Sequence, residues 1–153
     1  MRTGSHFSKT RAADPPSLRV MSTQNIFPAL RYRDAETALA WLTEAFGTEE
    51  RDVYRDGDGR IRHAELKLGY GLIMFGSYHE DRFLGGSPPD PRAGTISLYI
   101  TVGDPDAVHA RATQAGAEVV RELTETDYGS REFSARDLEG NLWSFGTYNP
   151  DDR

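Results

Sequence analysis

The sequence predicts an α+β fold made of two tandem β-α-β-β-β modules. Apolar residues alternate at strand spacing in two blocks, and each block contains one helical stretch with an apolar stripe. The glycines that end the two predicted helices, Gly47 and Gly116, lie 69 residues apart (116 − 47), and the turn glycines Gly59 and Gly129 lie 70 apart (129 − 59). Because these markers shift by a nearly constant amount, we interpret the chain as two copies of one unit.

The first module covers about residues 26–76. Its predicted elements are a strand at 26–33, a helix at 35–46, and strands at 49–55, 60–68 and 72–76. Asp34 is a good N-cap for the helix, and Gly47 a good residue to end it. The Asp-Gly turn at 56–59 predicts a hairpin. Side chains alternate along 60–68, which places Ala64, Leu66 and Leu68 on the face toward the helix. His63 and Glu65 therefore share the opposite face.

The second module covers about residues 95–148. Its predicted elements are a strand at 95–102, a helix opened by Pro105 and ended by Gly116, strands at 118–125 and 130–136, and a closing strand after the turn at 137–140. In the closing strand Trp143 and Phe145 share one face, which we expect to be core, and Ser144 lies on the other. Residues 77–94, rich in Gly and Pro, are interpreted as a linker between the modules; a lid over a site is the alternative.

Charge and composition exclude several classes of protein. Residues 1–20 carry +3 and the rest −9, which gives the net −6; a body this acidic argues against nucleic-acid and anionic-membrane partners. The absence of cysteine excludes disulfides and fits a cytoplasmic location. We predict a disordered tail at 1–20, either native or upstream of a start at Met21, followed by one domain at 21–150. No apolar run approaches the ~20 residues of a membrane span.

The repeat, together with the closing turn and strand, resembles the vicinal oxygen chelate superfamily, which includes glyoxalase I, bleomycin-resistance proteins and extradiol dioxygenases. The resemblance implies that the two modules form a curved mixed-sheet cup. In that family four side chains on the first and fourth strands of each module hold a metal. The matching positions here are Phe27, Met74, Thr95 and Ser144. They supply neither imidazole nor carboxylate, so we expect no metal and no cofactor.

The same register predicts which side chains face the cup. The candidate ligand-binding residues are Phe27, Arg31, His63, Glu65, Met74, Thr95, Ser97, Tyr99 and Ser144. Apolar, stacking and hydrogen-bonding groups in this mixture are typical of a small-molecule site. His63 and Glu65 are candidates for general acid–base work or a weak metal site, and the alternative is a solvated sheet face. Arg31 could hold a ligand carboxylate or pair with Glu65, and the pair is the favoured interpretation.

Two function classes follow from the resemblance. The first is a metal-free protein that binds a small organic molecule in the cup, similar to antibiotic-sequestering bleomycin-resistance proteins. The second is a lyase, isomerase or dioxygenase that uses a displaced metal or the pair of His63 and Glu65. The sequence leaves open whether the protein is an enzyme. The family also implies a homodimer, and the sequence does not tell whether modules pair within one chain or between chains.

Trp41 is expected in the core and His109 on the surface.

Overall fold

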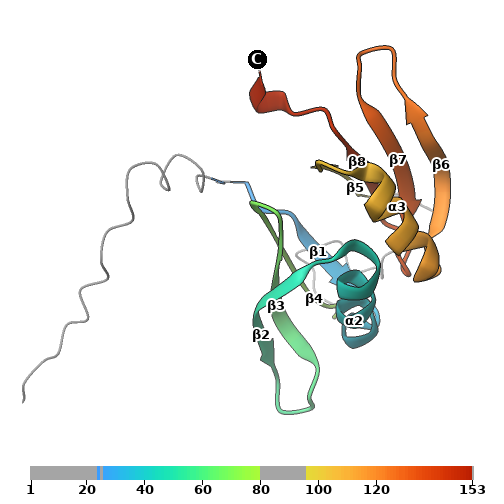
Figure 1. The fold of residues 1–153 in the computed structure, drawn as a ribbon. Coiled ribbons are helices and arrows are strands. Elements are labelled where there is room, and N and C mark those ends of the chain that lie inside the picture. The colour runs from blue at the N-terminus through green and yellow to red at the C-terminus, as the bar shows by residue number, and fades with distance from the viewer. Residues whose placement is uncertain (1–23, 25, 80–95, 153) are drawn as a thin grey trace, which may run out of the picture.

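The computed structural model describes residues 24, 26–79 and 96–152. The predicted tail at 1–20, Thr95 and most of the predicted linker lie outside these residues. The elements are β1 (Ala29–Tyr32), α2 (Ala35–Phe46), β2 (Glu49–Arg55), β3 (Ile61–Leu68), β4 (Gly71–Ser77), β5 (Ser97–Thr101), α3 (Pro105–Gln114), β6 (Glu118–Glu125), β7 (Arg131–Arg136), β8 (Leu142–Gly146) and the 3₁₀ turn η1 (Pro150–Asp152). The α+β class and the two β-α-β-β-β modules are confirmed (Figure 1).

Each module forms its own four-stranded mixed sheet. The strand orders are β1-β4-β3-β2 and β5-β8-β7-β6, so the first and last strands of each module are parallel neighbours. Leu30 pairs with Phe75 in the first sheet, and Ile100 pairs with Phe145 in the second. Each residue of the second pair lies 70 residues after its counterpart in the first pair (100 − 30 and 145 − 75). The repeat in the sequence therefore extends to the strand register.

The helices begin and end where the capping residues predict. Asp34 Oδ1 accepts from the backbone N–H of Thr37 over 3.1 Å, and Asp104 Oδ1 accepts from that of Ala107 over 3.1 Å. Gly47 ends α2 in the left-handed conformation at φ 74°, which glycine adopts without a steric penalty. Within the described ranges, no helix is long and apolar enough to span a membrane.

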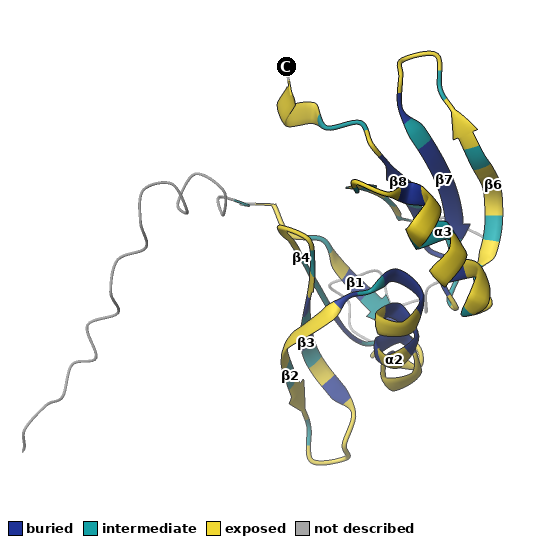
Figure 2. Ribbon diagram, in the orientation of Figure 1, coloured by how far each residue is buried: buried dark blue, intermediate teal, exposed yellow. Residues whose placement is uncertain are grey.

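One core joins the two modules. The helices α2 and α3 lie side by side, and the buried surface follows α2, β7 and β8 (Figure 2). The ring of Phe46 on α2 lies 5.0 Å from Trp143 and 4.9 Å from Phe145 on β8, and both of these are fully buried. Trp41 is also buried, and its Nε1 donates to the carbonyl of Ala115 over 2.9 Å. The predicted faces of the closing strand and the core place of Trp41 are therefore confirmed.

Two local predictions were wrong. The strand predicted at 26–33 begins only at Ala29, because Pro28 has no N–H to donate to the sheet, and Phe27 precedes the strand. His109, predicted on the surface, is half-buried: its ring meets Phe133 edge-on at 5.1 Å, and its Nε2 lies 3.0 Å from Oε2 of Glu122. The tight packing of α3 on β7 explains why this polar residue of the helix is covered.

Candidate functional site

The outer face of the second sheet, the face opposite its helix, contains a pocket of about 590 Å³. Its lining residues come from β5 to β8, the β6–β7 turn and the segment after β8: Ser97, Tyr99, Arg121, Tyr128, Glu132, Ser144 and Tyr148. Strand alternation explains the placement of Ser144, since its neighbours Trp143 and Phe145 are in the core. The structure thus brings together three residues predicted from the sequence, namely Ser97, Tyr99 and Ser144.

Glu132 supplies a buried charge to this pocket. Its side chain is only 5% exposed, Oε1 accepts from the Tyr128 hydroxyl over 2.8 Å, and Oε2 accepts from Arg121. Burial alone would raise the pKa of Glu132, but hydrogen bonds from Tyr128, Arg121 and Ser130 outweigh it and leave the pKa below its ordinary value. The pocket therefore holds an ionised carboxylate at neutral pH.

Three tyrosines form an aromatic wall beside this carboxylate. The ring of Tyr148 lies 6.3 Å from that of Tyr99 and 6.1 Å from that of Tyr128, at interplanar angles of 62° and 80°. The Tyr99 hydroxyl donates to the carbonyl of Tyr148 over 2.9 Å. Burial raises the pKa of Tyr99, and the hydrogen bond to Glu132 raises that of Tyr128. Both phenols therefore stay protonated at neutral pH and keep their donor protons.

Small residues complete the pocket. The hydroxyls of Ser134 and Ser144 lie 2.7 Å apart and hydrogen-bond across β7 and β8. Gly146 pairs with Glu132 in the sheet, and a Cβ at Gly146 would lie 2.6 Å from Cγ of Glu132 and 2.6 Å from the Tyr99 hydroxyl oxygen. Only glycine at this position leaves room for both side chains, so Gly146 helps to shape the site.

The outer face of the first sheet holds the candidate acid–base pair. His63 Nε2 lies 3.1 Å from Oε1 of Glu65, and Met74 is the register neighbour of Glu65 on β4. Arg51 makes the second contact of Glu65, with 3.5 Å between Nε and Oε2. The ring of Tyr54 lies 6.1 Å from that of His63. This sheet therefore brings together His63, Glu65 and Met74, as the strand register predicted.

The preferred partner of Arg31 was predicted wrongly. Arg31 lies near the end of β1, where its Nη1 is 3.4 Å from the carbonyl of Ser77 and 2.8 Å from Nδ1 of His79. Glu65 instead pairs with Arg51, because the irregular register of β2 at that point brings Arg51 beside β3. The predicted site residues thus form two groups on two sheets, and the lining of the second-sheet pocket comes from the second module.

Residues 25–145 match the family model described as the Glyoxalase/Bleomycin resistance protein/Dioxygenase superfamily. The chain belongs to this superfamily. An uncharacterised protein of Mycobacterium bovis is 32% identical over 122 residues, which is 78% of this chain and 80% of that protein. The crystal structure of TioX from Micromonospora sp. ML1 is 32% identical, has a TM-score of 0.65, and is matched over 80% of this chain and 94% of that one.

A fosfomycin resistance protein with a bound metal shows the same fold at low identity. The fosfomycin resistance protein FosX from Listeria monocytogenes, solved in complex with Mn(II) and 1S,2S-dihydroxypropylphosphonic acid, is 16% identical. Its TM-score is 0.58, and the match covers 86% of this chain and 94% of that one. At this identity the likeness establishes the fold alone.

The residues of this chain do not fit the metal site of its superfamily. Phe27 and Met74 have no hard donor, and Ser144 offers a hydroxyl that is already hydrogen-bonded to Ser134. Thr95 lies outside the described residues. Over the described ranges, no three His, Cys, Asp or Glu side chains are grouped so as to hold a metal ion. The donor chemistry at the three described positions is therefore unsuited to a divalent metal.

Sequence reasoning missed four residues of the pocket: Arg121, Tyr128, Glu132 and Tyr148. The repeat contains a signal for one of them. Glu132 follows the candidate His63 by 69 residues (132 − 63). The two occupy equivalent strand positions, because His63 pairs with Tyr54 and Glu132 with Thr124, so applying the repeat shift to His63 places Glu132 on the outer face of the second sheet.

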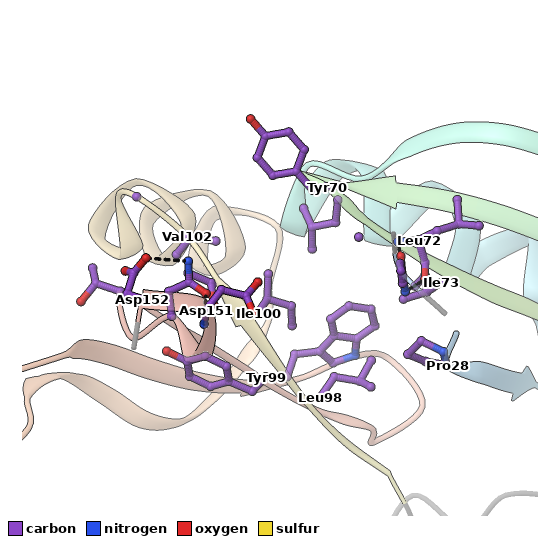
Figure 3. Close-up of a pocket in the computed structure, with 18 residues that line it drawn as sticks. Pro28, Tyr70, Leu72, Ile73, Leu98, Tyr99, Ile100, Val102, Asp151 and Asp152 are labelled. Atoms are coloured by element: carbon purple, nitrogen blue, oxygen red, sulfur yellow. Dashed lines mark hydrogen bonds between the residues drawn. The ribbon is translucent and has the colours of Figure 1, made fainter. Parts of the chain in front are cut away.

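A second hollow, of about 630 Å³, lies between the modules. Figure 3 shows Leu98 and Ile100 of β5 on one side and Leu72 and Ile73 of β4 on the other, with the C-terminal Asp151 and Asp152 near one end. Its walls mix aliphatic side chains with aromatic and polar ones. The backbone N–H of Leu72 donates to Oε1 of Gln24 over 2.7 Å, and Nε2 of Gln24 donates to the carbonyl of Leu72 over 2.9 Å. We assign the candidate site to the second sheet, where charged and aromatic groups converge.

Proposed function

We propose that the protein binds a small organic molecule without a metal, on the outer face of its second sheet. The observation that carries this proposal is the convergence of an ionised carboxylate, three tyrosine rings and serine hydroxyls around a pocket of about 590 Å³. Aromatic walls with a few placed polar or charged groups are a usual feature of small-molecule sites, and here the tyrosine rings form the walls. The unsuitable donors at Met74 and Ser144 favour binding over metal-assisted chemistry.

The antibiotic-sequestering type is the finer form of this proposal. Its support is membership of a superfamily that includes bleomycin-resistance proteins, together with a fold shared with FosX. Fold likeness alone does not assign a ligand, because one scaffold can host many activities. The proposal therefore depends on the pocket around Glu132 and not on any relative.

A second copy of the chain is the proposed partner. The outer face of the first sheet carries His63 and Glu65, whereas the pocket is lined by the second module. A homodimer that places the first sheet of one chain opposite the second sheet of the other would close the pocket into the cup that the superfamily implies. In the described sheets β1 and β5 are edge strands, and we propose that they take part in this assembly.

The test is a thermal melt of the full chain against a panel of small aromatic and polar molecules, and separately against zinc, nickel, manganese and iron. A ligand that binds only the folded state stabilises it by about 2.7 kcal/mol at a hundredfold excess over Kd. We expect organic ligands to raise the melting temperature, Tyr99→Ala to abolish the rise, and Tyr70→Ala, at a tyrosine that is 80% exposed, to leave it intact. Stoichiometric metal, lost on His63→Ala, would overturn the proposal.

The enzyme alternative rests on one observation, the 3.1 Å contact between His63 Nε2 and Glu65 Oε1. A hydrogen-bonded imidazole and carboxylate can move a proton in a lyase or isomerase reaction. Turnover of a bound ligand that is lost on His63→Gln, with ligand affinity unchanged, would establish this function. Binding that depends on Tyr99 with no turnover supports the binding protein instead.

A further inference from the structure

We propose that the second-sheet pocket selects an organic cation, such as an alkylated ammonium group attached to an apolar body. This inference names the ligand class of the proposed small-molecule site and therefore rests on that function. It follows from three features of the pocket: a buried carboxylate, an aromatic wall, and an arginine that is much more exposed than its partner.

The carboxylate of Glu132 has room for one more partner. An ionised carboxylate offers about four acceptor positions. Tyr128, Arg121 and Ser130 contribute to its hydrogen bonding, which accounts for three of these positions among the described residues. A buried charge gains most from a partner that is itself charged and close, because the surroundings screen the pair weakly.

The tyrosine wall suits the same ligand. Tyr99, Tyr148 and Tyr128 form a chain of rings inclined at 62° and 80°, with neighbouring centroids 6.3 Å and 6.1 Å apart. The faces of aromatic rings attract cations, and aromatic cages with this composition recognise quaternary and methylated ammonium groups. A carboxylate beside such rings adds a full negative charge to the weaker attraction of the ring faces.

Arg121 explains why a cation is favoured over an anion. Its side chain is 46% exposed, whereas that of Glu132 is 5% exposed. A ligand cation that displaces Arg121 sends the guanidinium into water and leaves Glu132 paired with the ligand. An anion that captures Arg121 would leave Glu132 buried without its cationic partner, which is strongly unfavourable. The net charge of −6 adds long-range attraction for cations.

The test uses three probes of similar shape: benzyltrimethylammonium, its uncharged carbon isostere neopentylbenzene, and the anion phenylacetate. Binding to the full chain is followed by amide chemical shifts at low salt and pH 7.5. We expect the cation to bind at least tenfold more tightly than the isostere, and phenylacetate to bind most weakly. Higher salt should reduce the preference for the cation.

Two substitutions in the pocket should change its affinity for the cation in opposite directions. Glu132→Gln keeps the shape of the side chain and should reduce cation affinity at least tenfold while leaving affinity for the isostere unchanged. Arg121→Gln should increase cation affinity severalfold, because the carboxylate loses its competing partner; at an anion site the same change would abolish binding. Glu118→Gln, on an exposed position of β6, makes the same charge change as Glu132→Gln outside the pocket and should have no effect.

Each outcome decides the inference. The proposed function would survive and the cation inference would fail if the isostere or phenylacetate bound as tightly as the cation, or if neutral compounds bound through Tyr99 and the cation did not. Failure of every probe and of the ligand panel would overturn both. Should Glu132→Gln fail to fold, Tyr128→Phe replaces it as the test. This substitution keeps the ring and frees one acceptor position of Glu132, so it should preserve or raise the affinity for the cation. A loss of cation affinity in Tyr128→Phe would overturn the inference.

Discussion

Tyr32 donates its hydroxyl to Oδ2 of Asp137 over 2.6 Å, which links the end of β1 to the turn before β8, 105 residues along the chain. Both side chains are buried. The same oxygen also accepts from Nδ2 of Asn141 and Nε1 of Trp143, each over 3.0 Å. Asp137 therefore joins the first module to the closing strand, and its network holds β8, the strand that carries Ser144 and Gly146, in place.

Tyr32→Phe should destabilise the protein by about 1.5–3 kcal/mol, the range for a hydrogen bond to a charged group. The ring itself remains and still packs edge-on against Phe75 at 5.3 Å, so the loss reports the hydroxyl alone. Urea unfolding measures it. Tyr54→Phe, at a tyrosine that is 58% exposed, is the matched control and should change the free energy of unfolding little. Equal effects of the two substitutions would contradict the role of the hydrogen bond.

The same phenol predicts a loss of stability at alkaline pH. Burial, followed by the charge of Asp137, raises the pKa of Tyr32 well above its ordinary value of 10.0. A raised pKa in the folded state contributes stability that is complete below the ordinary value and is lost as pH rises through the folded value. The difference in unfolding free energy between the native chain and Tyr32→Phe should therefore shrink above about pH 10. A constant difference between pH 7 and pH 11 would contradict this linkage.

Trp143→Ala should cost about 3–5 kcal/mol, the range for truncation of a large buried aromatic side chain. Trp143 is fully buried, contacts the ring of Phe46 and donates to Asp137, so the substitution removes both packing and a hydrogen bond. Denaturant unfolding measures the loss, and Tyr70→Ala at an exposed site is the control. A loss below about 1 kcal/mol would show that the core does not depend on this ring.

Local signals predicted most of the fold, because they are stored in short stretches of sequence. Asp34 and Asp104 cap the two helices, and alternation around Ser144 gave the correct faces of the closing strand. The start of β1 was missed because the alternating pattern runs on through Phe27, whereas Pro28 cannot donate to the ladder. Periodicity describes side-chain faces and does not show which backbone groups find partners.

The site was predicted only in part, because its charges are organised by contacts between strands. Ser97, Tyr99 and Ser144 follow from alternation within β5 and β8. The pairing of Arg121 with Glu132 depends on the irregular register between β6 and β7, which the sequence does not show. Tyr128 reaches Glu132 from a turn, where no periodicity applies. Only the repeat shift from His63 could have indicated Glu132.

Gly146→Ala should weaken ligand binding and cost about 1–3 kcal/mol of stability, the usual range for overpacking. The added Cβ would lie 2.6 Å from both Glu132 and Tyr99, so one of the two must leave its place. Gly103→Ala is the control, because nothing lies within 4 Å of its added Cβ. Melting curves with and without ligand separate the two effects. Unchanged binding in Gly146→Ala would exclude this close approach from the site.

Glu132 predicts a loss of stability at acid pH. Its pKa is lowered from the ordinary value of 4.5, because its hydrogen bonds outweigh the cost of burial. A lowered pKa contributes stability that is present above the ordinary value and is lost as pH falls through the folded value. The native chain should therefore be more stable than Glu132→Gln at pH 7, and this difference should shrink below about pH 4.5. The same difference at pH 3 and pH 7 would contradict the assigned pKa direction.

The chain should form a homodimer through its edge strands. In the described sheets β1 pairs with β4 and β5 with β8, so β1 and β5 are edge strands. Light scattering at micromolar concentration should give twice the 17.1 kDa of one chain. Val102 donates to the carbonyl of Gly146, so the neighbouring N–H of Thr101 points away from β8. Thr101→Pro removes this N–H and should weaken the dimer. Thr101→Val keeps that N–H and should leave the dimer intact, whereas a monomer mass for the unaltered chain would contradict the prediction.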